Sequence, residues 1–374
     1  MGRGSIRRRL IGGIAFIAIA LLSCQAILGI TPRDELTDNP DSSSGDADVE
    51  ASTDLCGSRG LPERPAETTS SPSDAVKVIA ALRTVDLGLD AGDGYGFNLD
   101  RVCTCPGVDG CKRPDTKHIC DGVNGIDNGG RSLFRAASNL GLVREKELNA
   151  TIQQGISGVF LRVDGWNGTP TDAKVRVSIY ASLGFSADAS ASPQFDGNDV
   201  WTVDEGSVLG SDVEKPKYFA DDAYVTNGSL VVPSLDFPIT VGGASSQPAV
   251  TLELSDGVIQ AKLSTVNGIT QLDGVIAGRW PAKTLLTGLQ VFYDPNDPNR
   301  TPFCGDSGLY QIFKDFTCSL VDIPRSPSID NTAAPCDALA IGIRFIAVAA
   351  KLGPIVAHPD SGAPCGQGYS DSCF

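Results

Sequence analysis

Short apolar segments, each broken by glycine, proline or a turn-forming pair, follow one another from residue 75 to residue 350. The clearest is Lys174–Ala181, where Val175 and Val177 alternate with polar neighbours at the period of a half-buried strand. Further strands are predicted at Ala75–Leu89, Val159–Val163, Ile269–Gly278, Leu309–Val321 and Ala338–Ala350. The first of these also fits a helix, but Thr84 and Val85 favour extended chain.

Two segments are predicted to fold as β-hairpins. Ala223–Val232 is centred on Asn227-Gly228, and Val250–Leu263 is centred on Asp256-Gly257. Both pairs suit a two-residue turn in which each central residue needs a positive φ.

Helices are predicted at Arg131–Asn139, Glu145–Gln153 and Pro281–Leu289. The first has a stop signal at Asn139-Leu140-Gly141, and the last begins with a proline, which suits a first helical turn. Strands this short and this regularly interrupted predict a mainly β protein. The expected architecture is an antiparallel β-sandwich, lectin-like or jelly-roll, with a few short helices and disulfide-rich loops.

The chain begins with a basic segment and an apolar run. Arg3 and the triplet Arg7–Arg9 precede Leu10–Leu22, and small residues follow. This arrangement is typical of a secretory signal peptide. The alternative is an uncleaved membrane anchor, because Leu10–Ile30 has roughly the 20 apolar residues that cross a bilayer. In both interpretations the arginines stay inside and the rest of the chain lies outside.

The end of that run, Leu21-Leu22-Ser23-Cys24, resembles the lipobox of bacterial lipoproteins. The resemblance implies that residues 1–23 are a signal peptide and that Cys24 carries lipid and inserts the N-terminus into a membrane. Gln25 follows the cysteine in place of Asp, which by the same resemblance implies the outer membrane of a Gram-negative bacterium. Only the first thirty residues carry this likeness, which is shared with uncharacterised predicted lipoproteins, so it implies no activity for the body.

Residues 24–53 have little to bury and many acidic and hydroxyl side chains, so they are predicted to be a disordered tether. Residues 54–374 are long enough for one large β domain. Removing residues 1–23 takes away four of the 30 basic residues and no acids, which leaves 26 basic and 45 acidic residues and a formal charge of −19. A body of this charge without a basic cluster disfavours nucleic-acid binding.

The cysteine count of eleven is odd, which is awkward for an exported protein. Assigning Cys24 to lipid leaves ten candidates for disulfides: Cys56, Cys103, Cys105, Cys111, Cys120, Cys304, Cys318, Cys336, Cys365 and Cys373. Proximity in the sequence predicts pairs within Cys103–Cys120, Cys304 with Cys318, and Cys365 with Cys373. These pairs leave Cys56 and Cys336 as a long-range pair. Zinc is disfavoured because the Cys103–Cys120 spacing lacks paired C-x₂-C motifs.

The strongest metal candidate is calcium. Asp121, Asn124, Asp127 and Asn128 alternate with glycines in one loop, and Asp100 lies upstream in the same loop-rich region. Calcium takes six to eight oxygen ligands of this kind. The competing interpretation is a Gly-Asn-Asp turn held by hydrogen bonds from its own side chains.

Catalytic motifs are weak. Cys304–Gly308 resembles the nucleophile loop of trypsin-like proteases, but the following residues depart from the family and nothing orients His118 as a base. Trp166, Trp201 and Trp280 suit either sugar stacking or core packing. The sequence therefore favours a cell-envelope lipoprotein that binds a carbohydrate or protein partner or serves structurally. The alternative is an extracellular carbohydrate hydrolase on a β-sandwich, whose paired carboxylates leave no local signature.

Overall fold

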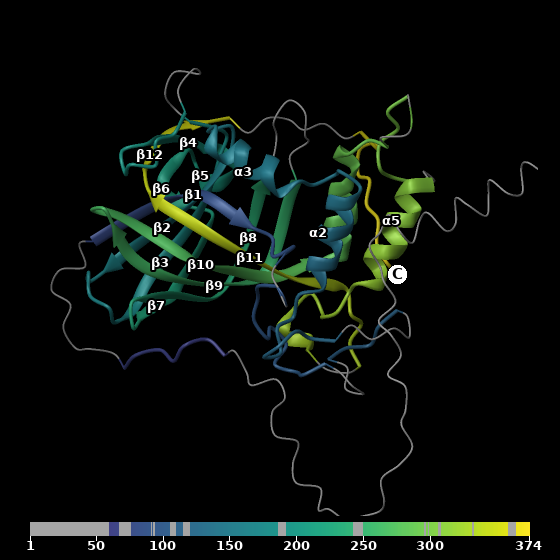
Figure 1. Cartoon of the computed structure of the whole chain (residues 1–374), viewed down its shortest axis with the longest axis horizontal. Coiled ribbons are helices and arrows are strands. Elements are labelled where there is room, and N and C mark those ends of the chain that lie inside the picture. Colours follow the sequence, from purple (N-terminus) through teal and green to yellow (C-terminus); the bar gives the residue numbers. More distant parts are fainter. Residues whose placement is uncertain are drawn as a thin grey trace, which may run out of the picture.

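Eight antiparallel strands pair edge to edge until the last one meets the first, so the main sheet is a closed barrel. The strand order is β1-β11-β10-β9-β8-β7-β3-β2 (Figure 1). The computed structural model describes residues 60–66, 76–90, 92, 94–104, 110–114, 120–185, 192–241, 250–294, 297, 299–305, 308–330, 333–357 and 364–374. The barrel strands are β1 (Val76–Asp86), β2 (Gly158–Trp166), β3 (Asp172–Ser182), β7 (Tyr218–Thr226), β8 (Ser229–Val241), β9 (Val250–Val266), β10 (Ile269–Pro281) and β11 (Ala338–Ala349).

The mainly β, antiparallel prediction is confirmed, but the predicted sandwich is wrong. In a sandwich each sheet keeps two free edges, whereas each of these eight strands has a partner on both sides. Several pairs contain register shifts, for example between Val232 and Leu235 of β8 and between Ala277 and Arg279 of β10. Such bulges bend and twist a sheet, which helps it to close.

The barrel is filled by apolar side chains. Along β11, Leu339, Ile341 and Ile343 belong to the main core, whereas the intervening Ala338 and Ala340 pack outside the barrel wall. This alternation follows from the two-residue period of a strand. An eight-stranded barrel is just wide enough for side chains to fill.

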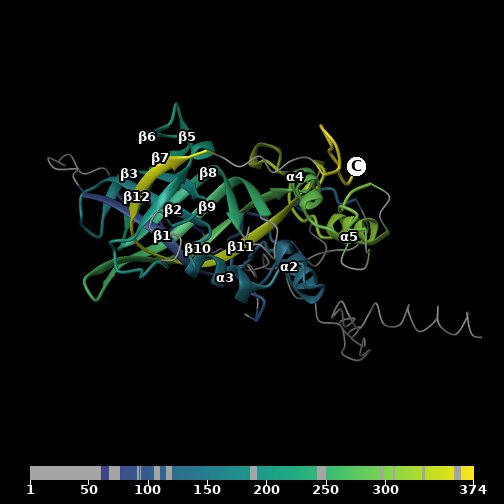
Figure 2. The same ribbon diagram turned by 90° about the horizontal axis from the view of Figure 1, so that it is seen from above.

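Helices close one end of the barrel. They are α2 (Gly129–Asn139), α3 (Glu145–Gln153), α4 (Ala282–Gly288) and α5 (Gly308–Ser319), and each contributes side chains to the main core. Figures 1 and 2 show α2 and α5 beyond the same end of the strands. Short 3₁₀ turns lie at Glu205–Ser207, Leu289–Val291 and Pro327–Ile329. Among the described residues, no helix is long and apolar enough to cross a membrane.

A second layer covers part of the outer wall. The parallel pair β4 (Val200–Asp204) and β12 (Lys351–Val356) packs there through Trp201, which contacts Phe160 of β2. The small hairpin of β5 (Val208–Leu209) and β6 (Asp212–Pro216) stands out from the wall (Figure 2). None of these four strands was predicted, because they are short.

The helix predictions are confirmed, with Glu145–Gln153 matching α3 at both ends. Gly141 has a positive φ of 72° just after α2, as the predicted stop requires. The predicted strand Leu309–Val321 is wrong, because this segment forms α5. Its buried residues Tyr310, Phe313 and Thr317 recur every three or four positions, which is a helical period.

One hairpin prediction is confirmed and the other is wrong. Asn227 and Gly228 have positive φ values of 50° and 74° and join β7 to β8. Asp256 also has a positive φ, 50°, but β9 continues through it, and the pair Asp256-Gly257 lies at a bulge opposite β8. The turn that joins β9 to β10 is Asn267-Gly268 instead.

Three disulfides are defined within the described residues. They join Cys111 to Cys336, Cys304 to Cys365 and Cys318 to Cys373. The predicted pairs Cys304–Cys318 and Cys365–Cys373 are therefore wrong, because the two cysteines of the C-terminal tail bond to Cys304, just before α5, and to Cys318, in its last turn. The pair Cys56–Cys336 is also wrong, and so is a partner for Cys111 within Cys103–Cys120, because Cys111 and Cys336 bond to each other. Cys103 and Cys120 are also disulfide-bonded. Cys24, Cys56 and Cys105 lie outside the described residues.

Candidate functional site

A buried polar region surrounds Arg279, near the end of β10. Neighbouring Trp280 points into the barrel core, so Arg279 projects to the outside of the wall. Its side chain is nevertheless fully buried, because two loops, residues 94–104 and residues 322–330, lie over it. An arginine without access to water must find partners within the protein.

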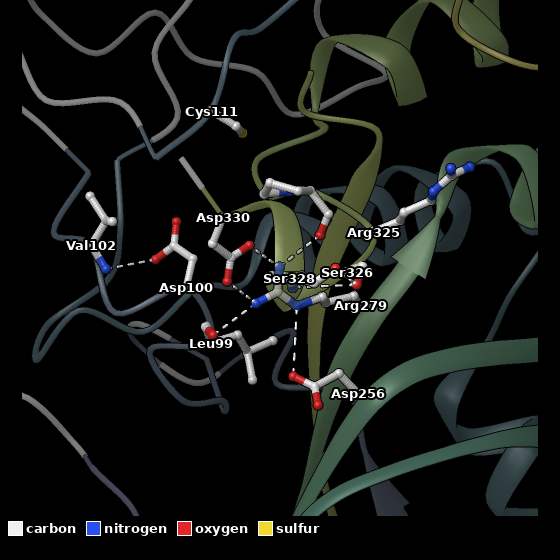
Figure 3. Close-up of polar contacts among 12 residues, drawn as sticks. Leu99, Asp100, Val102, Cys111, Asp256, Arg279, Arg325, Ser326, Ser328 and Asp330 are labelled. Atoms are coloured by element: carbon white, nitrogen blue, oxygen red, sulfur yellow. Dashed lines mark hydrogen bonds and ion pairs between the residues drawn. The ribbon is translucent and has the colours of Figure 1, made fainter. Parts of the chain in front are cut away.

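Arg279 obtains those partners from both loops (Figure 3). Its two terminal nitrogens pair with the two carboxylate oxygens of Asp330 at 2.6 and 2.7 Å. They also donate to the carbonyl oxygens of Leu99, at 2.9 Å, and Pro324, at 2.8 Å. The Nε atom lies 3.9 Å from Asp256, too far for a hydrogen bond. Arg279 therefore fastens both loops to the barrel wall.

A cluster of acidic side chains lies beside this arginine. Asp127 is buried, and its Oδ2 accepts hydrogen bonds from the amides of Leu99, at 2.6 Å, and Asp100, at 3.3 Å. Asp121 accepts from the amide of Thr104 at 2.7 Å. These bonds hold loop 94–104 against the loop that precedes α2.

Asp100 has an unusual environment. One oxygen, Oδ1, accepts from the amide of Val102 at 2.8 Å (Figure 3). The other oxygen, Oδ2, is buried and has no hydrogen-bond partner among the residues that the structure describes, and the whole residue is only 6% exposed. A Cβ added to Gly110 would overlap with this Oδ2, so the absence of a side chain there makes room for it.

Asp322 completes the cluster from the loop that precedes β11. Its Oδ1 accepts from the amide of Ala340 at 2.7 Å, and its Oδ2 accepts from the amide of Gly129 at 2.9 Å. Gly129 is the first residue of α2, where an unpaired amide and the helix dipole favour a negative charge. Asp322 thereby ties the start of α2 to the barrel wall.

Burial raises the pKa of every carboxyl in the cluster. It raises the pKa of Asp100 to about 6 and that of Asp322 to about 7. It also raises the pKa of Asp121, and that of Asp127 well above its usual range, with a further increase from the charge on Asp100. Positive charge opposes this increase at two of them: Arg279 acts on the pKa of Asp100 and Arg113 on that of Asp322.

The structure brings together three of the five predicted calcium ligands, Asp100, Asp121 and Asp127. Asn124 is exposed in a turn, with a positive φ of 63°. Asn128 caps α2: its Oδ1 accepts from Arg131 at 3.0 Å, and its amide group donates to Tyr95 at 2.6 Å. As the side chains stand, no group of three or more His, Cys, Asp or Glu in the described part of the chain is arranged to hold a metal ion. Calcium binding stays a prediction.

The other predicted candidates are placed as follows. Trp201 and Trp280 are 0% and 4% exposed and pack in cores, so they present no face for a sugar. Trp166 is half-buried, and its Nε1 donates to the carbonyl of Thr169 in its own turn. His118 and the serine of the Cys304–Gly308 segment lie outside the described residues.

Sequence reasoning missed Arg279, Asp322 and Asp330. Arg279 carries a recognisable signal, since it is a lone charge in the otherwise apolar run from Val275 to Trp280. Asp322 and Asp330 carry no such signal, because their partners are distant in the sequence.

No family model, no curated protein and no solved structure matches this chain.

Proposed function

We propose that this chain is an exported, lipid-anchored protein of the cell envelope, whose barrel is a binding or structural module rather than an enzyme. The disulfides are the observation that supports export most directly. Disulfides persist in oxidising compartments and are rare in the cytosol. The bridge between Cys111 and Cys336 spans 225 residues, so it constrains much of the chain.

The lipid anchor is supported by the sequence Leu21-Leu22-Ser23-Cys24. The expected attachment is through acyl chains on Cys24, each buried CH₂ contributing about 0.8 kcal/mol. A tether of acidic and hydroxyl residues then separates the barrel from the bilayer. The strong negative charge of the mature chain suits solubility at that distance and disfavours partners that carry phosphate backbones.

Mass spectrometry of the chain expressed in a Gram-negative host tests the anchor. We expect the wild type to lack residues 1–23 and to carry lipid on Cys24. The variant Cys24→Ser should remain as an uncleaved precursor without lipid. Density separation of the membranes should place the wild type in the outer membrane. An intact segment 1–23 without lipid in the wild type would instead establish the signal-anchor alternative.

A glycan-binding screen on the full chain separates a binding module from the carbohydrate hydrolase. The burial of Trp201 and Trp280 supports the non-enzymatic interpretation, because these side chains are unavailable for stacking on a substrate. We expect either binding without turnover or no glycan binding, the latter pointing to a protein partner or a structural role. Release of shortened glycan products would overturn the proposal.

A further inference from the structure

We infer that the outer wall of the barrel carries a binding site for an arginine-containing peptide, which the chain fills with its own residues 60–66. We call this segment, Gly-Leu-Pro-Glu-Arg-Pro-Ala, the strap. The partner expected in its place is a segment of another protein in which prolines flank an arginine. The inference names a partner for the proposed binding module and so rests on that function, but it needs no lipid on Cys24.

The strap lies on the barrel wall below β7 in Figure 1 without belonging to the sheet. Its residues form no helix and no strand, and Pro62 and Pro65 favour an extended chain. Leu61 packs against the apolar cluster outside the wall that contains Leu99 and Ala277. Extended proline-rich peptides dock on the surfaces of partner proteins with contacts of this kind.

Arg64 is the polar anchor of the strap. Its Nη1 donates to the carbonyl oxygen of Ala173 on β3 at 2.9 Å, and its Nη2 donates to the carbonyl oxygen of Asp222 on β7. Ala173 lies in one register shift between β3 and β7, and Asp222 lies in the next shift along the same pair of strands. A bulge leaves a residue out of the ladder, so its carbonyl group is free to accept from another donor.

Tyr224 adds an aromatic surface beside these two carbonyl groups. It projects outward from β7, because Ala223 and Val225 on either side of it belong to the main core. It is nevertheless only 5% exposed: the guanidinium carbon of Arg64 lies 4.6 Å from the centre of its ring, and its hydroxyl donates to the carbonyl oxygen of Pro62 at 2.5 Å. Two carbonyl acceptors beside an aromatic ring suit the planar fork of arginine better than the point charge of lysine.

The link between the strap and the barrel is long enough for the strap to leave this site while the sheet stays paired. Nine residues separate Ala66 from Val76, the first residue of β1. Fully extended, such a link reaches roughly 30 Å. In the barrel β1 lies two strands away from β3, which is about 10 Å across the sheet. The strap is therefore an autoinhibitory segment, which a partner must displace before it binds.

The test is a fluorescence-polarisation titration of a labelled peptide with the sequence of residues 60–66 into the full chain, purified in detergent. In Arg64→Ala the strap no longer competes for the site, whereas in the wild type it holds the site closed. We therefore expect binding to the wild type to be at least about tenfold weaker than binding to Arg64→Ala. A peptide with lysine in place of its arginine should bind Arg64→Ala at least about tenfold more weakly than the arginine peptide.

The matched control is Glu63→Ala, which changes an exposed neighbour of the anchor and should leave the site as closed as in the wild type. The thermal unfolding midpoint shows whether each variant is folded. If Arg64→Ala does not fold, Leu61→Asp opens the site by removing the apolar anchor of the strap.

Binding to neither opened variant, or equal binding to the wild type and an opened variant, would overturn the inference, and so would equal binding of the lysine peptide. Dimers of the wild type that the arginine peptide dissociates would overturn the protein partner, because the site would then accept the strap of a second copy. Failure of the peptide to bind leaves the glycan screen and the mass spectrometry of Cys24 unaffected, so it is distinguishable from failure of the proposed function.

Discussion

Arg279 illustrates how a single residue can join a barrel to its covering loops. Its guanidinium group makes two bonds to Asp330 and one bond to each of two carbonyl oxygens, all without contact with water. The planar fork of arginine suits such bidentate contacts, which the point charge of lysine does not reproduce. Removing one partner of a buried pair leaves the other charge unmatched, which is the costly case.

We therefore predict that Arg279→Met destabilises the protein by about 3–5 kcal/mol, because Asp330 and two carbonyl groups lose their donor. The control is Arg344→Met on β11. Arg344 also contacts both oxygens of its partner, Asp273, at 3.0 and 3.1 Å, but the two side chains are 45% and 37% exposed. Its loss should cost about 0–1 kcal/mol. Urea unfolding measures both, and equal losses would show that burial does not set the strength of these pairs.

Single residues of the candidate site were predictable only where they are close in the sequence. Asp121 and Asp127 stand out because they share a glycine-rich loop, and Asp100 is near enough to be linked to them. Asp322 reaches the same cluster through the folding of the barrel, about two hundred residues later. A polar side chain whose partners come from distant segments leaves no local pattern.

At the scale of elements, two similar dipeptides, Asn-Gly and Asp-Gly, form two different structures. Asn227-Gly228 makes a hairpin turn, whereas Asp256-Gly257 makes a bulge within β9. Both pairs have a positive φ at the first residue. The sequence therefore predicts this backbone conformation, but it does not predict whether the pair forms a hairpin turn or a bulge. Distant contacts decide between them: in the bulge, the Asp256 amide donates to Asp236 of β8. For α5, the helical period of its buried residues outweighs the β-type composition.

The contact between β11 and loop 94–104 provides a test at this scale. A Cβ at Gly342 of β11 would overlap with the carbonyl group of Tyr95, so the loop lies directly on the strand. We predict that Gly342→Ala costs about 1–3 kcal/mol through overpacking and accelerates hydrogen exchange at the Leu99 amide.

Gly268→Ala is the comparison for that strand variant. Gly268 has a positive φ of 81° in the β9–β10 turn, and no atom lies within 4 Å of an added Cβ. Its replacement should cost about 1–2 kcal/mol through the backbone alone and leave exchange in loop 94–104 unchanged. Unchanged exchange in Gly342→Ala as well would contradict the close contact of loop and strand.

At the scale of the whole molecule, the strands were largely predictable and their closure was not. Period and turn chemistry identify most of the eight barrel strands, because those signals are local. Whether the sheet closes depends on the pairing of β1 with both β2 and β11, which joins the two ends of the domain. The disulfides were likewise not predictable where they join distant segments. Proximity in the sequence predicted Cys304–Cys318 and Cys365–Cys373, while the three bonds defined within the described residues connect segments 55 to 225 residues apart.

The disulfides differ in burial, and this difference predicts the order in which they open. Cys111 and Cys336 are 2% and 1% exposed, whereas the bridges Cys304–Cys365 and Cys318–Cys373 are half-buried beside the C-terminal tail. Thiol–disulfide exchange requires a thiolate to reach a sulfur atom, so access sets the rate in the native state. Under mild reductant, we expect the two tail bridges to open while Cys111–Cys336 stays closed until the barrel unfolds. Timed alkylation followed by peptide mass spectrometry measures this order. Opening of the buried bridge as fast as the tail bridges would mean that the loops around Arg279 and Cys111 separate from the barrel without global unfolding.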